Sequence, residues 1–253
     1  MMKFTRKSTR HEATEAPRFL YCLSTDMFPL PVRTWNNKRY CQFIIDKHTR
    51  YPWVLWFYAK SEFSTAFPRF CLTLEERFNT KIVDLRGDSG ELTWGGITKF
   101  CDEHQPNQIT LKLSPPYTQA LNGAVERSLG IYRARAACLL ATAQLTYRFF
   151  NYAMEYACEI GRCMINKESG LTPHEMVHKS KPDYKRLHPF GCLVVVFVPK
   201  ERRKDWTNVL QKSEPGLFLG YRSQRIVIVY KASNFSAILL QAPSSLQSVH
   251  LQS

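Results

Sequence analysis

Short apolar runs rich in aromatic and β-branched residues recur along this chain and predict strands. The runs lie at 19–25, 39–45, 53–59, 81–85 and 108–113. The second and third are joined by the turn-like segment DKHTRYP, so we expect them to form a hairpin. Later runs, CLVVVFV, PGLFLGY and IVIVY, predict further short strands near the C-terminal end.

Other apolar positions recur at three- and four-residue steps, which is the period of a helix. The first such face consists of Phe63, Phe67, Phe70, Leu74 and Phe78. Ser61 is its expected N-cap, and Pro68 is expected to interrupt it. Helices are also predicted at about 96–103, 122–143 and 147–166, with Asn122 as the N-cap of the longest.

This order of elements predicts an α/β fold with a mixed five-stranded sheet flanked by helices. The first three strands should form an antiparallel meander, and the later two should join by parallel crossovers. We divide the chain into a basic flexible leader (1–18), a core (19–166), a basic extension with short strands (167–223) and a divergent tail (224–253).

Composition narrows the range of partners. Thirty-five Lys and Arg against 21 acids give a net charge of +14, which favours a polyanionic partner, nucleic acid first and an anionic membrane surface second. The eight Cys lack zinc-finger spacing and are expected to be reduced thiols. No secretory signal or membrane-spanning run is apparent, so we expect a soluble intracellular protein, nuclear or cytoplasmic.

Three acids fall where side chains converge in α/β sheets, at strand ends and helix starts. Asp26 should close the first strand, Asp88 follows the fourth strand, and Glu126 should lie in the first turn of the long helix. Carboxylates brought together repel one another unless a divalent cation such as Mg²⁺ neutralises them. Taken singly, each acid is equally compatible with a turn, a cap or a helix-dipole role.

The sequence segments around these acids are more specific than the spacing of the acids. TDMFPLP, RYCQFIIDKHTRYPWV, LRGDSGE, PPYTQALNGAVER, LTPHEM, KPDYKRLHPFGC and LFLGYRS occur in this order over about 23–223. This series resembles the integrase of copia-type LTR retrotransposons. The resemblance implies an RNase H-like catalytic core at 19–166, with a D,D-E triad that binds two Mg²⁺ (or Mn²⁺) ions. By motif match the triad is Asp26, Asp88 and Glu126, and not the more conspicuous Asp46.

The implied chemistry is polynucleotidyl transfer in two steps. Water cleaves the 3′ end of the element's DNA, and the freed 3′-hydroxyl attacks target DNA. The implied partner is double-stranded DNA, as element ends and as target, together with further copies of the chain in a homo-oligomer; no membrane or small-molecule substrate is implied. Six residues are candidate DNA contacts: Tyr117, Gln119, Asn122, Arg127, Arg133 and Lys112.

The sequence also departs from the family's pattern. Nothing matches the N-terminal zinc-binding His/Cys module, the usual DNGGE is DSGE, and the resemblance fades after FLGYRS. We therefore expect a truncated copy with weak or no activity.

Three alternatives remain open at this stage. The chain could be a non-catalytic DNA-binding remnant that uses the basic segment 179–204, which has eight Lys and Arg against two acids. It could be another RNase H-like nuclease acting on RNA–DNA hybrids, although the YTQALNGAVER segment argues against this. It could also be a reading frame from which no stable protein is made.

Overall fold

The computed structural model describes residues 16–114, 119–197, 213–223 and 226–231. Its larger sheet has five strands in the order β3-β2-β1-β4-β5. The strands are β1 (Cys22–Pro29), β2 (Tyr40–Asp46), β3 (Pro52–Phe57), β4 (Asp84–Asp88) and β5 (Thr110–Ser114). β1 pairs antiparallel with β2, and β2 with β3, whereas β1–β4 and β4–β5 are parallel. The predicted mixed α/β sheet is confirmed.

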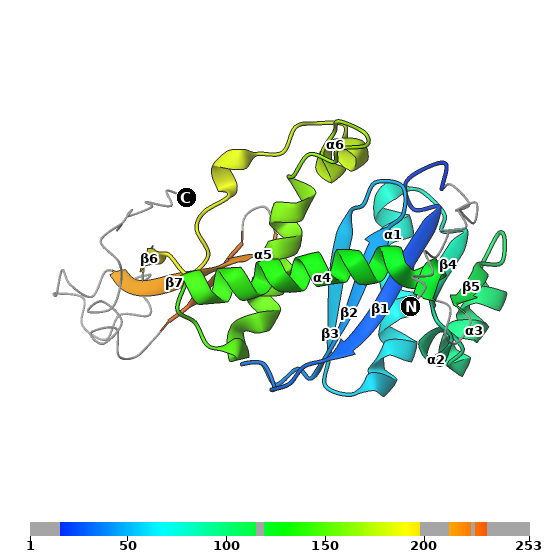
Figure 1. The fold of residues 1–253 in the computed structure, drawn as a ribbon, viewed down its shortest axis with the longest axis horizontal. Helices are drawn as coiled ribbons and strands as arrows, with labels where there is room; N and C mark the ends of the chain where they lie inside the picture. The colour runs from blue at the N-terminus through cyan, green and yellow to red at the C-terminus, as the bar shows by residue number, and fades with distance from the viewer. Residues whose placement is uncertain (1–15, 115–118, 198–212, 224–225, 232–253) are drawn as a thin grey trace, which may run out of the picture.

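Helices cover both faces of this sheet (Figure 1). The α-helices are α1 (Phe63–Phe78), α2 (Ser89–Leu92), α3 (Gly95–Asp102), α4 (Gln119–Thr142), α5 (Phe150–Arg162) and α6 (Pro173–His178). Short 3-10 turns lie at η1 (Lys60–Glu62), η2 (Tyr147–Phe149) and η3 (Tyr184–Arg186). In the described part of the chain, no helix is long and apolar enough to cross a membrane.

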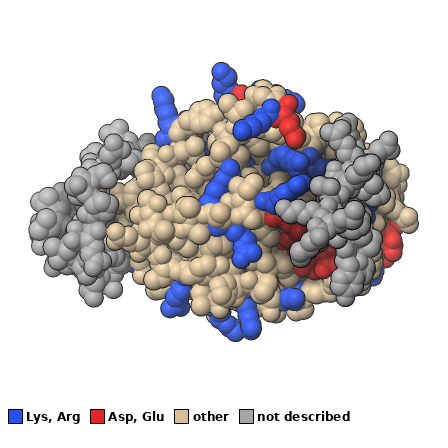
Figure 2. All heavy atoms as spheres, in the orientation of Figure 1, with Lys and Arg blue, Asp and Glu red and all other residues tan. Residues whose placement is uncertain are grey.

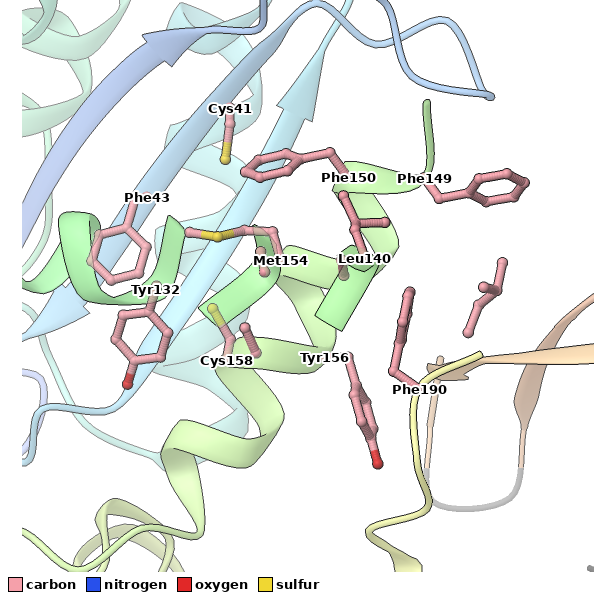
Figure 3. Close-up of a cluster of buried hydrophobic side chains, with 14 of the residues drawn as sticks. Cys41, Phe43, Tyr132, Leu140, Phe149, Phe150, Met154, Tyr156, Cys158 and Phe190 are labelled. Carbon is pink, nitrogen blue, oxygen red and sulfur yellow. The ribbon is translucent and has the colours of Figure 1, made fainter. Parts of the chain in front are cut away.

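The two faces of the sheet are packed separately because successive strand residues point to opposite sides. Ile44 belongs to a cluster with α1 and α3, whereas its neighbours Phe43 and Ile45 belong to a cluster with α4 and α5. Figure 3 shows the second cluster, in which Phe43 lies beside Tyr132 of α4 with ring centroids 5.2 Å apart. Both clusters are largely aromatic and aliphatic, so burial of apolar area holds the helices on the sheet.

A second sheet, of three antiparallel strands, packs against the far side of α5. Its strands are β6 (Leu193–Phe197), β7 (Ser213–Tyr221) and β8 (Val227–Tyr230), in the order β6-β7-β8. Tyr156 of α5 contacts it edge-on through Phe218, with ring centroids 5.4 Å apart, and its hydroxyl donates to the backbone oxygen of His188. The hydrophobic cluster is therefore continuous from the first sheet to the second.

Two predictions about α1 are wrong. The helix runs through Pro68 without ending, because Phe63, Phe67 and Leu74 are buried on one face and their packing outweighs the hydrogen bond that proline removes. Ser61 is not the N-cap, because it lies within η1, and Glu62 directly precedes the helix. The Glu62 carboxylate accepts hydrogen bonds from the backbone N–H groups of Tyr58 and Ala59 instead.

The long helix α4 lies against α5 at close range. Five of its buried residues recur at three- and four-residue steps: Val125, Leu129, Tyr132, Ala136 and Leu140. Gly161 of α5 faces Tyr132, and a Cβ atom at position 161 would overlap the tyrosine ring. The absence of a side chain at this glycine therefore sets how closely the two helices approach.

Candidate active site

Asp26 lies inside β1 and does not close it, contrary to the prediction. The strand continues to Pro29, since Phe28 pairs with Cys41 and Pro29 pairs with Tyr40 of β2. Strand alternation puts Asp26 on the same face as Phe28, which packs in the cluster beneath α4. The carboxylate is therefore directed to the side of the sheet that α4 covers.

Asp88 and Glu126 approach this place from two other elements. Asp88 is the last residue of β4 and the N-cap of α2, where its side chain accepts from the Gly90 N–H at 3.4 Å. Glu126 is an exposed residue of α4. Because α4 begins at Gln119, Glu126 lies in the third turn and not in the first, and Asn122 is inside the helix and is not its N-cap.

Asp88 and Glu126 lie close enough to Asp26 to act on its charge. The pKa of Asp26 is raised to about 6, first by burial, then by the charges of Glu126 and Asp88. Arg133 of α4 and a hydrogen bond with the backbone of Met27 oppose this rise. A neighbouring carboxylate that raises the pKa of Asp26 destabilises its ionised form, and this free-energy cost is removed when a cation joins the acids.

Glu91 of α2 is a fourth acid in this region, and the sequence analysis missed it. Burial raises its pKa to about 7, with smaller contributions from Asp26 and Asp88. Its carboxylate accepts a hydrogen bond from Gln42 Nε2 at 3.3 Å, which lowers the pKa again. The available signal was its position in LRGDSGE, three residues after Asp88.

The acidic side chains do not converge closely enough to form a metal-binding group. Within the described ranges, no three His, Cys, Asp or Glu side chains are arranged so that they could hold a metal ion. The donor set nevertheless consists of carboxylate oxygens, which hard divalent cations prefer. The site therefore has suitable ligand chemistry, with the acids within electrostatic reach of one another.

The candidate DNA contacts are only partly described. Tyr117 lies outside the described residues, and Gln119 and Asn122 lie in α4 with side chains that are not described. Arg127 is exposed on α4, and the guanidinium of Arg133 lies 4.9 Å from the centroid of the Phe28 ring. Lys112 of β5 pairs with the carboxylate of Asp84.

The surface around α4 carries both signs of charge. Figure 2, in the orientation of Figure 1, shows acidic atoms gathered at one place on this face, beside a group of Lys and Arg atoms. Arg135, nine residues after Glu126, instead lies 5.2 Å from the centroid of the Tyr132 ring. Of the two arginines, Arg133 is therefore the one that acts on the acidic group.

Sequence comparison finds relatives among retrotransposon polyproteins. The chain is 28% identical over 205 residues to the retrovirus-related Pol polyprotein from transposon RE1 of Arabidopsis thaliana, covering 81% of this chain and 14% of that protein. It is 28% identical over 199 residues to the corresponding polyprotein from transposon RE2 of the same plant, covering 78% and 13%. The chain thus spans about one seventh of the length of these relatives. No family model matches it.

Structural comparison agrees with this result. A chain of the cryo-EM structure of the simian T-cell lymphotropic virus intasome, in complex with PP2A regulatory subunit B56 gamma, superimposes with a TM-score of 0.51. The match covers 85% of this chain and 77% of that chain at 14% identity, so it shows a shared fold. The resemblance to retrotransposon Pol polyproteins is confirmed, and the chain shares the fold of a chain of a viral intasome.

Proposed function

We propose that this chain is a retrotransposon integrase-like polynucleotidyl transferase, which processes the 3′ ends of element DNA and transfers them into target DNA. The observation that carries this proposal is the raised pKa of Asp26, caused after burial by Glu126 and Asp88. These acids come from β1, β4 and α4, far apart in sequence, and a fold that brings like charges together pays a stability cost. A site for cations accounts for that cost.

The metal ligands in this proposal are Asp26, Asp88 and Glu126, and the ions are two Mg²⁺ or Mn²⁺. When bound, such ions supply charge stabilisation for the oxygens of an in-line phosphoryl displacement. The protein's own contribution is positional. β1 and β4 are adjacent parallel strands, so they fix the spacing of Asp26 and Asp88, while α4 brings Glu126 to them.

Positive side chains near the acids would orient the phosphate that reacts. Arg133 lies close enough to Asp26 to lower its pKa, and Arg127 is exposed on the same helix. Charge-assisted contacts from Arg to phosphate fix register without reading sequence. Water and the 3′-hydroxyl are the two nucleophiles, so no covalent intermediate on the protein is required.

Double-stranded DNA and further copies of this chain are the partners in this proposal. A net charge of +14 supports the first, and the shared fold with a chain of a viral intasome supports both. We propose that activity is weak, because the DNGGE motif of the family that the chain resembles is DSGE in this sequence.

An oligonucleotide cleavage and strand-transfer assay tests the proposal. We expect Mg²⁺- or Mn²⁺-dependent products from the unaltered chain and none above background from Asp88→Asn. Asp102→Asn is the matched control, since Asp102 is an exposed acid at the end of α3 on the opposite face of the sheet. Equal product from Asp88→Asn and Asp102→Asn would exclude catalysis by this site.

A non-catalytic DNA-binding remnant is the second candidate. It is favoured by the basic composition and by the lack of a closed three-ligand metal group in the described part of the chain. It predicts DNA binding that falls steeply with salt and does not change when divalent metal is replaced by EDTA.

A further inference from the structure

Two strands of the larger sheet, and the end of a third, carry a cation on the face that α4 covers. Lys47 directly follows β2, Arg86 lies in β4, and Lys112 lies in β5. We call these residues the basic triad. The backbone N–H of Lys47 donates to the Cys22 oxygen, Cys22 pairs with Asp84, and Arg86 pairs with Lys112. The triad therefore lies across one part of the sheet, with β1 between Lys47 and Arg86, and Arg86 directly opposite Lys112.

The triad faces the same side as the candidate metal ligands. Side chains two residues apart in a strand share a face, so Arg86 shares one with Asp88. Cys22, opposite Lys47, shares that face with Asp26 by the same rule. One strand period of two residues spans about 6.6 Å, which separates Arg86 from Asp88 along β4.

Like charges in the triad act on one another. The pKa of Lys47 is lowered, first by burial and then by the charge of Arg86, with Lys112 and Arg50 adding to the effect. All three triad side chains are partly buried, and the carboxylate of Asp84 pairs with Lys112. Cations held this close in a partly desolvated place attract an anion, because an anion offsets their repulsion and their lost hydration.

The spacing fits one strand of a nucleic acid. Successive phosphates of a DNA strand lie about 3.4 Å apart along the helix axis, so about 6.6 Å corresponds to two phosphate steps. We propose that the basic triad binds a phosphate of the same DNA strand, two phosphate steps from the phosphate that lies at Asp26 and Asp88. The choice of DNA as the anion rests on the proposed function, whereas the anion site rests on the triad alone.

Salt-dependent binding of a fluorescein-labelled duplex oligonucleotide in EDTA tests this inference without catalysis. The variant is Lys47→Gln with Arg86→Gln, which leaves the Lys112–Asp84 pair intact. The matched control is Arg69→Gln with Lys99→Gln, which removes the same charge from α1 and α3 on the opposite face. We expect the slope of log K against log salt to fall by about 1.8 in the variant and to stay unchanged in the control.

Equal slopes in the variant and the control would overturn the inference. A measurement on the unaltered chain guards against a variant that fails to fold: an amine-reactive label should modify Lys47 more slowly once the duplex is added, with Lys99 unaffected. Equal labelling of Lys47 with and without duplex would also overturn it. Asp88→Asn separates the two proposals, since it should lose cleavage and keep the full salt slope. If the triad variant lowers the salt slope but the unaltered chain never cleaves DNA, this inference is supported and the proposed function is wrong.

Discussion

Two acids of the core, Glu75 and Asp26, are placed on opposite faces of the same sheet and have opposite surroundings. Glu75 of α1 accepts from Lys81 Nζ at 2.9 Å, from the Ile82 N–H at 2.8 Å and pairs with His104 Nε2 at 2.9 Å. Its side chain is 3% exposed. Every partner is a donor, so this carboxylate ties α1 to the segments before β4 and after α3.

The charged side chains that act most strongly on Asp26 are acids, whereas the neighbours of Glu75 are hydrogen-bond donors. Burial, Glu126 and Asp88 all raise its pKa, and Arg133 only partly compensates. A carboxylate matched by donors stabilises the fold, whereas one surrounded by carboxylates costs stability until a cation arrives. The comparison teaches that the chemical nature of a buried acid's neighbours, more than its burial, separates a structural acid from a candidate ligand.

The largest expected effect is that of removing Glu75 on the free energy of unfolding. Glu75→Ala leaves the buried His104 and the half-exposed Lys81 without their shared partner. We expect the free energy of unfolding to fall by about 3 to 5 kcal/mol in urea denaturation. Glu76→Ala, which removes the exposed acid next in the helix, should change it by less than about 0.5 kcal/mol. A small effect at position 75 would mean that the three-partner cluster does not hold the fold.

Asp26→Asn should stabilise the metal-free protein. With a folded pKa of about 6 against 3.8 unfolded, the stability that Asp26 contributes is full below about pH 4 and is lost as the pH rises through about 6. Asn has no charge to lose, so at pH 7.5 in EDTA we expect about 1 to 3 kcal/mol greater stability than the unaltered chain, and no difference at pH 4.

Asp46→Asn provides the contrast for that measurement. Asp46 is buried, and its carboxylate accepts from the Thr49 N–H, the Thr49 hydroxyl and the Leu20 N–H. An amide cannot accept on both sides, so this variant should lose about 1 to 3 kcal/mol at neutral pH. If both Asn variants shift stability in the same direction, the distinction between structural acids and candidate ligands fails.

Divalent metal should stabilise the protein through the candidate site. An ion with a dissociation constant of about 1 mM, present at about 10 mM, adds about 1.4 kcal/mol. We expect thermal unfolding with Mg²⁺ or Mn²⁺ to show a rise of this order in the unaltered chain, none in Asp88→Asn, and a full rise in Asp102→Asn. A rise that survives in Asp88→Asn would place the ion elsewhere.

The smallest expected effect concerns Arg133, a cation that opposes the rise in the pKa of Asp26. Arg133→Gln removes a charge that lowers the pKa of Asp26, so that pKa should rise by less than about one unit. A carboxyl-carbon NMR titration would measure the shift. Arg135→Gln is the control, since Arg135 lies against the Tyr132 ring, and it should leave the pKa of Asp26 unchanged.

Much of the fold could be predicted from residue patterns. The aromatic and β-branched runs give five strands within a few residues of their observed positions, and the hairpin of β2 and β3 follows from the intervening turn. The apolar face of α1 is observed too, with Phe63 and Phe67 fully buried. The misplaced ends arise where tertiary pairing and packing override local signals, as at Pro29 in β1 and Pro68 in α1.

The candidate site was harder to predict. Motif resemblance selects Asp26 over Asp46, and the structure shows why Asp46 differs: it is fully enclosed by its own hydrogen bonds. The position of Glu91 three residues after Asp88 was a local signal for it, but its contact with Gln42 could not be predicted, because Gln42 belongs to a strand 49 residues earlier. The basic triad was invisible for the same reason, since only sheet register brings Lys47 to Arg86 and Lys112.

Gly161 has a consequence that reaches from the helix interface to the acids. Tyr132, which occupies the space over this glycine, lies six residues after Glu126, or about 9 Å along the axis of α4. A methyl group at position 161 would push Tyr132 and α4 away from α5. Because a helix is stiff, this shift would also move Glu126. The position of the Glu126 carboxylate thus depends on the missing side chain at position 161, so Gly161→Ala should displace it and weaken the site although every acid is still present.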